Sequence, residues 1–443
     1  MWKFSRLGEV GMGKRTLSMF LALALALSSS VYAQTPSKKL CVVKDNLHYD
    51  SIGVFSKGLF EVSRYSDKNQ LTRVYGLIDT AGNQVVPLKY HYMSSISDSY
   101  IRVGMDTDNN MDTGMPYFGW GLDKWGFINT QNQMVIPVTY DRAEDFSEGL
   151  ALVGKDYQYI QKGILGFPDS TATGYKIGFV NQNGKVVVPL VYDDAKNFSE
   201  GLSVVTKDRK SGFVDKNGKI VIPLIYDNAE SFSEGLAAVS KNGKSGFINA
   251  QGKVVIPLRY DTVGNFKEGL VMIGQGDKRG VINKQGKVVV QPIYDYVDDF
   301  SEGLALVYQV VDKSKAKCKY GFINQSGKVV IPLSFTSASS FSDGLAIVKT
   351  TDELNKNYTV IDKNGKTVLH YPDKSIHNFR NGILELGKNT YQDHNLPDTF
   401  GLIDKQGNEI LPMKYSSISF DDEFAVTRER NGNSIIWGIR SAG

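Results

Sequence analysis

Carboxylates are the side chains of this chain best suited to chemistry, and they recur at fixed places. One set precedes Gly-Leu and another follows a tyrosine. The members are Glu148, Glu200, Glu234 and Glu302 in the first set, and Asp141, Asp193, Asp227, Asp261 and Asp295 in the second. Catalysis requires one asymmetric group of side chains rather than a residue copied into every segment. We therefore expect these carboxylates to accept hydrogen bonds from backbone N–H groups, and we predict that the protein is not an enzyme.

A second acidic pattern lies in the segment 106–112, where oxygen-bearing side chains occupy alternate positions. Calcium loops begin in this way, but Met111 stands where such a loop has glycine and Tyr117 where it has a bidentate glutamate. A calcium loop and a solvated acidic loop both remain open. The five histidines show no metal-ligand spacing. We predict no metal site and no cofactor.

Aromatic side chains gather in insertions that interrupt an otherwise regular sequence. The insertions span residues 102–123, 155–176, 310–319 and 388–399. Exposed aromatics beside polar groups suit contacts with proteins or glycans, and insertions often carry recognition. We predict a candidate recognition surface at Tyr117, Phe118, Trp120, Tyr157 and Tyr159. The alternative is that these rings only pack the loops onto the rest of the protein.

The regular sequence that must position these residues repeats with a fixed period. The phrase that starts Gly-Phe-Ile-Asn has its first glycine at Gly178, Gly212, Gly246 and Gly280, each 34 residues after the last. A period of this size indicates an array of structural repeats that stack on their neighbours.

Each repeat contains three apolar runs separated by turn residues. In one unit these are Gly246–Ile248, Val254–Ile256 and Leu270–Ile273. β-Branched residues in short runs favour strands, and the Asn-x-x-Gly-Lys segment between the first two favours a tight hairpin with a positive φ at glycine. Every unit is therefore predicted to be a three-stranded β-meander.

The same frame fits most of the chain. We predict that residues 1–33 are a signal peptide, 34–54 an N-terminal arm, and 55–443 an array of nine units with a half unit at each end. The half units are Phe55–Leu59 and Trp437–Ile439. The predicted fold is all-β, with tandem three-stranded meanders in an open superhelical array. The alternative is a closed β-propeller-like ring, in which the half units complement each other. Ten units of three strands favour the open array, because common propellers have four to eight blades of four strands.

The repeats resemble the WG repeat family of bacterial proteins. Lys124-Trp125-Gly126-Phe127-Ile128 matches the motif that names the family, and Trp437-Gly438 matches it near the end. The resemblance covers nearly all of the chain after the leader. It implies a β-repeat architecture and no particular activity.

The first 33 residues have the three parts of an export signal. A basic leader precedes the apolar run Met19–Leu27, and Ala33 ends a segment that suits cleavage. The leader carries a net charge of +3, so its removal lowers the chain's +4 to +1. A near-neutral chain gives no electrostatic case for nucleic acid, and no later segment is long and apolar enough to span a membrane. We predict a periplasmic or secreted protein.

The two cysteines, Cys41 and Cys318, lie in the predicted arm and in an insertion. In an oxidising compartment they form a candidate disulfide, and the alternative is two unpaired thiols.

The function predicted from these features is a non-enzymatic binding or scaffold module of the bacterial cell envelope, whose partner is an envelope protein or glycan. The alternative is a hydrolase that acts on envelope glycans with an asymmetric carboxylate pair, which requires a defined separation of the two groups. Asp299 and Asp343 lie outside the repeat frame and are its candidates.

Overall fold

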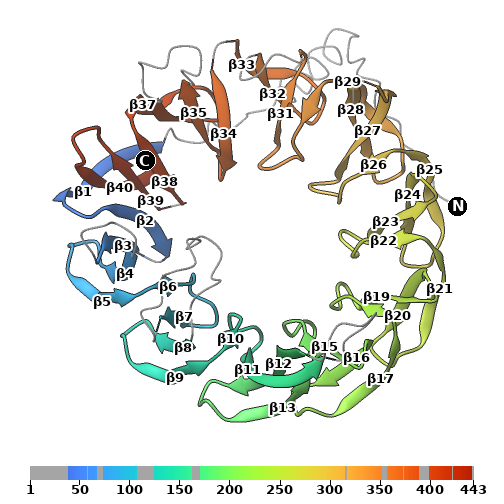
Figure 1. The fold of residues 1–443 in the computed structure, drawn as a ribbon. Helices are drawn as coiled ribbons and strands as arrows, with labels where there is room; N and C mark the ends of the chain where they lie inside the picture. Colours follow the sequence, from blue (N-terminus) through green and yellow to red (C-terminus); the bar gives the residue numbers. More distant parts are fainter. Residues whose placement is uncertain are drawn as a thin grey trace, which may run out of the picture.

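The described residues form ten four-stranded antiparallel sheets arranged in a ring (Figure 1). The computed structural model describes residues 38–56, 58–66, 73–106, 124–161, 170–314, 317–351, 357–372, 374–388, 399–421 and 423–441. The chain is a ten-bladed β-propeller. The predicted open superhelical array of three-stranded meanders is therefore wrong, and the ring that was its alternative is the architecture of the chain.

One blade shows how the repeat builds a sheet. It contains β14 (Asp194–Ala195), β15 (Leu202–Lys207), β16 (Lys210–Asp215) and β17 (Ile220–Tyr226). The strands follow one another from the centre of the ring to its rim (Figure 1). The first strand pairs through only two residues, Asp194 and Ala195. This strand is the one that the three-stranded prediction missed, because two residues carry no alternating pattern.

The other blades have the same strand order. Four of them are β2 (Ser51–Ser56), β3 (Leu59–Tyr65), β4 (Arg73–Ile78) and β5 (Gln84–Tyr90); β6 (Tyr92–Met93), β7 (Tyr100–Met105), β8 (Lys124–Asn129) and β9 (Met134–Tyr140); β10 (Arg142–Ala143), β11 (Leu150–Gln161), β12 (Ser170–Asn181) and β13 (Val186–Tyr192); β18 (Asn228–Ala229), β19 (Leu236–Lys241), β20 (Lys244–Asn249) and β21 (Val254–Tyr260). Four more are β22 (Thr262–Val263), β23 (Leu270–Gln275), β24 (Lys278–Asn283) and β25 (Val288–Tyr294); β26 (Tyr296–Val297), β27 (Leu304–Asp312), β28 (Lys317–Asn324) and β29 (Val329–Phe335); β30 (Ser337–Ala338), β31 (Leu345–Lys349), β32 (Tyr358–Asp362) and β33 (Thr367–Tyr371); β34 (Ser375–Arg380), β35 (Ile383–Lys388), β36 (Thr399–Asp404) and β37 (Glu409–Tyr415).

The tenth blade closes the ring with strands from both ends of the chain. It contains β38 (Ser417–Phe420), β39 (Phe424–Arg428), β40 (Ser434–Ser441) and, at the rim, β1 (Lys38–Leu47). β1 pairs antiparallel with β40, with Cys41 opposite Gly438. The ring thus begins inside the predicted N-terminal arm. The C-terminal half unit is completed by this arm, whereas the half unit Phe55–Leu59 belongs to the next blade.

The predicted repeat unit straddles two blades. Gly-Phe-Val and the strand after it are the third and fourth strands of one sheet, and the Phe-Ser-Glu-Gly-Leu segment begins the second strand of the next. The phenylalanines of these two segments meet at the blade boundary, as Phe213 and Phe232 do with ring centroids 5.0 Å apart. Both side chains are almost fully buried, so the core consists of the layers between blades.

The predicted hairpin between the third and fourth strands is present. Gly218 and Gly252 occupy it with φ of 80° and 75°, as predicted. Trp437 does not occupy the position of Trp125, however. Trp125 lies opposite Gly104, the fifth residue of its second strand, whereas Trp437 lies opposite Ala425, the second residue of its second strand. Trp437-Gly438 therefore matches the motif in sequence only, because the two tryptophans occupy different positions in their blades.

Candidate functional site

Neighbouring strands of a blade run antiparallel. The connections between the second and third strands of the blades therefore all lie on one face of the ring. We call this the insertion face. All four predicted insertions fall at this connection, between β7 and β8, β11 and β12, β27 and β28, and β35 and β36. The first and second strands, and the third and fourth, are joined on the opposite face. The four insertions therefore share one face of the ring.

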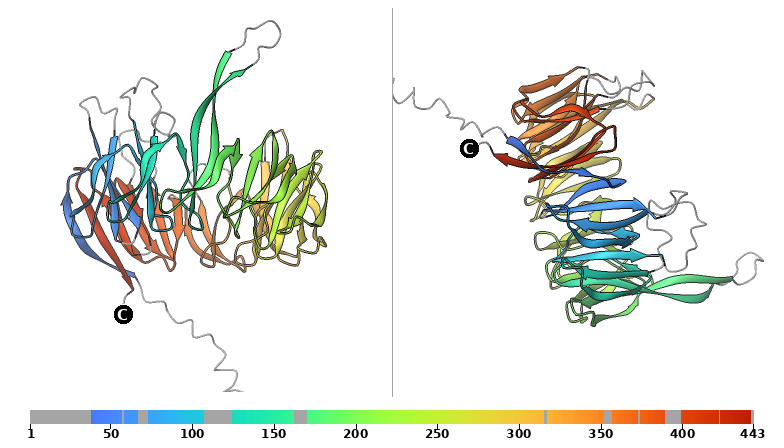
Figure 2. Two further views of the ribbon diagram at one scale, coloured as in Figure 1. Left: turned by 90° about the horizontal axis from the view of Figure 1, so that it is seen from below. Right: turned by 90° about the vertical axis from the view of Figure 1, so that its left-hand side faces the viewer.

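The hairpin β11–β12 projects from the insertion face beyond the body of the ring (Figure 2). Its two strands stay paired from Leu150 opposite Asn181 to Gln161 opposite Ser170. Each strand has twelve residues, whereas β15 and β16 have six. The hairpin is the largest described departure from the repeat.

One predicted recognition residue lies on this hairpin with its side chain described. Tyr157 is 36% exposed and faces Gly174 across the hairpin. The Lys176 ammonium lies 4.8 Å from the centre of the Tyr157 ring, and Tyr175 is 44% exposed. A cation over an aromatic face is suited to binding. Tyr175 lies on the other face of the hairpin, because neighbouring residues of a strand point to opposite faces.

The remaining predicted recognition residues contribute less. Tyr159 lies on β11, opposite Ala172, but its side chain is outside the described residues. Tyr117, Phe118 and Trp120, and most of the acidic segment 106–112, also lie outside them.

The recurring carboxylates are structural, as predicted. On the face opposite the insertions, a carboxylate of one blade accepts a hydrogen bond from a glycine N–H of the next, and we call these bonds blade stitches. They join Asp98 to Gly149, Glu148 to Gly201, Glu200 to Gly235, Glu234 to Gly269, Glu268 to Gly303, Glu302 to Gly344 and Asp343 to Gly382, over 2.8 to 3.1 Å.

The aspartates that follow tyrosine join the same blades on the insertion face. Asp193 accepts hydrogen bonds from the Lys176 ammonium (2.6 Å) in its own blade and from the Asp208 N–H (2.7 Å) in the next. Asp141, Asp227, Asp261 and Asp295 make equivalent pairs of bonds. Each of these blade boundaries is therefore fastened on both faces.

Replacing Glu234 with alanine should lower the free energy of unfolding by about 1 kcal/mol at pH 7, because one half-exposed stitch is lost. Partial burial raises the pKa of Glu234, but hydrogen bonds from the Lys284 ammonium and the Gly269 N–H lower it overall, below its ordinary 4.5. A lowered folded-state pKa gives stability that is present above pH 4.5 and is lost as the pH falls through the folded value. Denaturant unfolding should show a larger loss at pH 7 than at pH 3. Glu234→Gln, which keeps an acceptor oxygen, should lose less, and an equal loss in both variants would contradict the stitch.

One position in the second strand carries a charged residue in three blades that lie close to the closing blade. The third residue of this strand faces the following blade and is apolar in most blades. The ten residues, from the blade of β2 onward, are Glu61, Arg102, Leu152, Val204, Ala238, Met272, Leu306, Ile347, Glu385 and Val426. The three charged residues lie in blades next to, or one removed from, the closing blade. Aligning the units in this register would have revealed them from the sequence.

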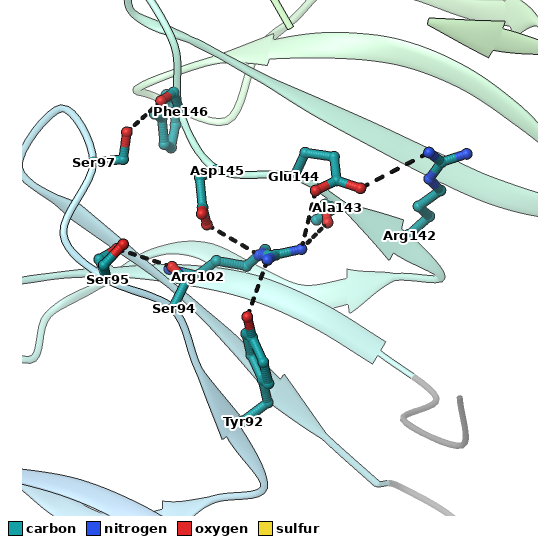
Figure 3. A network of polar contacts seen from close by, with 10 residues as sticks. All are labelled: Tyr92, Ser94, Ser95, Ser97, Arg102, Arg142, Ala143, Glu144, Asp145 and Phe146. Atoms are coloured by element: carbon teal, nitrogen blue, oxygen red, sulfur yellow. Dashed lines mark hydrogen bonds and ion pairs between the residues drawn. The ribbon is translucent and has the colours of Figure 1, made fainter. Parts of the chain in front are cut away.

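Arg102 is the centre of a polar network between two blades (Figure 3). Its Nε donates to Asp145 Oδ1 (3.1 Å), and its other nitrogens contact Tyr92 Oη, Glu144 and the Ala143 carbonyl oxygen. The guanidinium carbon lies 4.9 Å from the centre of the Trp125 ring. With a side chain only 12% exposed and its donors occupied, Arg102 fastens the blade of β7 to that of β10.

Glu61 is the second charged residue at this position. Burial raises the pKa of its carboxyl to about 7, and the charge of Arg73 opposes part of that rise. The ionised form is therefore disfavoured in the folded ring.

Glu61→Gln should stabilise the protein at pH 8 by about 1–3 kcal/mol and leave it unchanged at pH 4. A raised folded-state pKa makes the native carboxyl lose stability as the pH rises from 4.5 through 7, and glutamine removes this loss. Denaturant unfolding of both proteins across this range would measure the difference. A difference that does not vary with pH would contradict the assignment.

Glu385 lines a cavity beside the closing blade, together with Phe379, Arg380, Ile418, Ser419 and Phe420. The cavity has a volume of about 430 Å³ and lies against β38. A second cavity, of about 270 Å³, lies on the side of β38 toward β2 and is lined by Ser51, Ile52, Gly53, Ser417, Ile418, Ser419, Val426, Arg428 and Ser434. The strands nearest the ring centre are longer here, with six residues in β2 and β34 and four in β38, against two in most blades.

The predicted disulfide does not fit the ring. Cys41 lies on β1 of the closing blade and Cys318 on β28, with two whole blades between them (Figure 1). A disulfide needs Cα atoms within about 7 Å.

Within the described ranges, no group of three or more histidine, cysteine, aspartate or glutamate side chains suits a metal ion. The same residues include no helix long and apolar enough to cross a membrane.

A protein-family model described as WG containing repeat matches more than half of the chain. The matched segments are residues 75–106, 125–159, 177–210, 212–244, 246–278, 280–309, 320–352 and 400–432. A search of curated proteins found no match.

Solved structures that resemble the chain include a eukaryotic initiation factor (12% identity, TM-score 0.46, 85% of this chain and 99% of that one). They also include BamB from Moraxella catarrhalis (12%, 0.30, 67% and 93%) and the dihydro-heme d1 dehydrogenase NirN (16%, 0.32, 60% and 71%). TM-scores this low carry no argument about function.

Proposed function

The chain belongs to the WG repeat family, and from this premise we propose that it is a non-enzymatic binding module of the cell envelope. The observation that carries the proposal is the hairpin β11–β12, which projects from the insertion face and presents Tyr157, Tyr175 and Lys176. The ring is the rigid support, because its recurring polar residues are used in fastening blades. The partner is an envelope protein or glycan.

Export is part of this proposal and rests on the residues of the leader, which lie outside the described part of the chain. The basic segment, the apolar run and Ala33 support cleavage and release into the periplasm or the medium. Cell fractionation with N-terminal sequencing of the product tests it. A cytoplasmic product that retains the leader would overturn it.

One of the two candidate residues of the hydrolase alternative takes part in a structural hydrogen bond. Asp343 accepts the hydrogen bond from the Gly382 N–H (2.9 Å) and is part of a blade stitch. The alternative stays a prediction, which a panel of glycan substrates would test. Turnover that a single carboxylate substitution abolishes would support it.

The binding proposal is tested by trimming the hairpin. Blade β14–β17 joins its second and third strands through the two-residue turn Asp208-Arg209, so this turn can replace residues 156–175 without disturbing the ring. Full-length and trimmed proteins would be immobilised and exposed to envelope extract, and the affinity of any captured partner then measured. We expect at least a tenfold weaker affinity for the trimmed protein, at an unchanged melting temperature. Equal affinities, or no partner for either form, would contradict the proposal.

A further inference from the structure

The larger cavity at the closing blade carries a separate inference, which goes beyond the proposed function. It lies where the blade of β34–β37 meets β38, and its volume of about 430 Å³ falls in the range of small-molecule sites. Its lining combines a guanidinium, a carboxylate, a hydroxyl and apolar side chains.

The cavity arises where two residues depart from the repeat. The segment Phe379-Arg380-Asn381-Gly382 occupies the place of Phe-Ser-Glu-Gly in other blades. In those blades the serine hydroxyl donates to the phenylalanine carbonyl of the next blade, as Ser199 does to Phe232 (2.8 Å). Arg380 replaces that serine, and Asn381 replaces the carboxylate of the blade stitch. The two side chains that usually form hydrogen bonds between neighbouring blades are thus replaced at this boundary.

Glu385 is the second departure. It stands where seven other blades have Leu, Val, Ala, Met or Ile, and it is only 6% exposed. Arg380 and Glu385 thus bring two opposite charges to the wall of one cavity, which is typical of a binding site.

The lining specifies the chemistry of the ligand. The Arg380 guanidinium is suited to a carboxylate, which it binds with paired hydrogen bonds. Glu385 is suited to an ammonium group, and the rings of Phe379 and Phe420 with Ile418 form the apolar part. We propose that this cavity binds a small zwitterion with an apolar side chain, either a free α-amino acid or a short peptide.

Calorimetry with the full ring tests this proposal. The probes are L-leucine and L-phenylalanine, trileucine as the peptide source, and two blocked forms, N-acetyl-L-leucine without an ammonium and L-leucinamide without a carboxylate. We expect binding of at least one zwitterion below 1 mM, weakened at least tenfold in each blocked form. Tighter binding of the free amino acid or of the peptide identifies the source. No binding of any zwitterion, or equal binding of the blocked forms, would overturn the proposal.

Two variants separate loss of the site from loss of the fold. Glu385→Leu restores the residue type of most other blades and should abolish binding, and thermal unfolding checks that the variant is folded at the temperature of the measurement. Arg380→Ser restores the usual serine and should also weaken binding at least tenfold. Glu61→Gln changes the same strand position in a blade that does not line this cavity, so it serves as the matched control and should bind as the native protein does. Native binding by Glu385→Leu would contradict the proposal.

Discussion

Replacing Gly246 with alanine should destabilise the ring by about 3 kcal/mol or more, although the change adds a single methyl group. Gly246 is the third residue of the third strand of its blade, where a bulge brings the fourth strand close. A Cβ at this position would lie 2.5 Å from the Ile256 carbonyl oxygen and 2.7 Å from two Pro257 backbone atoms. Backbone atoms on both sides must shift, which is costlier than moving a flexible side chain. Denaturant unfolding monitored by circular dichroism measures the loss.

Gly243→Ala is the matched control for this prediction. Gly243 lies three residues away and has a φ of 73°, but a Cβ there would meet no atom within 4 Å. Its substitution therefore costs only backbone strain, about 1–2 kcal/mol. Similar losses in the two variants would mean that the close approach at Gly246 does not limit stability. Gly178, Gly212 and Gly280 also come this close to backbone atoms of the fourth strand, so the result would apply to the glycine of the family motif in general.

Deleting residues 212–245 should destabilise the protein by at least about 5 kcal/mol, much of the stability of a typical domain. The deletion removes one 34-residue unit and leaves the repeat in frame. In an open array the loss would be confined to neighbouring units. In this ring, ten blades divide the circle into steps of about 36°, and nine would need about 40° at every boundary. The stitches and the phenylalanine contacts would all be strained.

Thermal unfolding and size-exclusion chromatography would measure this effect. The hairpin-trimmed protein is the control, because it also loses a segment of the chain but keeps all ten blades. A deletion variant that folds to a monomer with the native melting temperature would contradict the closed ring.

The repeat and its strands could be predicted from the sequence because each depends on local patterns. The period of 34, the β-branched runs and the turn glycines all appear in the structure. The fourth strand could not be predicted in the same way. β14 and most of its equivalents consist of two residues, and the strand that begins at Leu202 pairs in a different sheet from β13, the strand that precedes it in the predicted three-stranded unit.

The closed ring was only the alternative prediction for a related reason. β1 contains Cys41-Val42-Val43, a short apolar run without the turn signals of the repeat, and its partner β40 lies at the other end of the chain. The pairing of strands so far apart in the sequence cannot be recognised from a local pattern of residues.

The candidate sites show the same division between local and non-local information. The insertions were visible as interruptions of the period, and the hairpin β11–β12 is one of them. The cavity at β38 depends on Arg380, Glu385 and Phe420 meeting across two blades, which only the three-dimensional arrangement reveals. The repeated carboxylates were correctly predicted to accept backbone hydrogen bonds. A residue that recurs at the same place in successive units is most simply needed for the structure of the unit.

The closed ring is the claim on which the rest depends, and an engineered disulfide tests it most directly. Cys41 on β1 lies opposite Gly438 on β40, so a Gly438→Cys substitution places two thiols at one register position. In a Cys318→Ser background, oxidation should give a bond between Cys41 and the new thiol within a single chain, detected by peptide mass spectrometry. The bond should also raise the melting temperature, because it joins the ends of the ring. A chain that stays reduced, or that forms only disulfide-linked dimers, would contradict closure of the ring by β1 and β40.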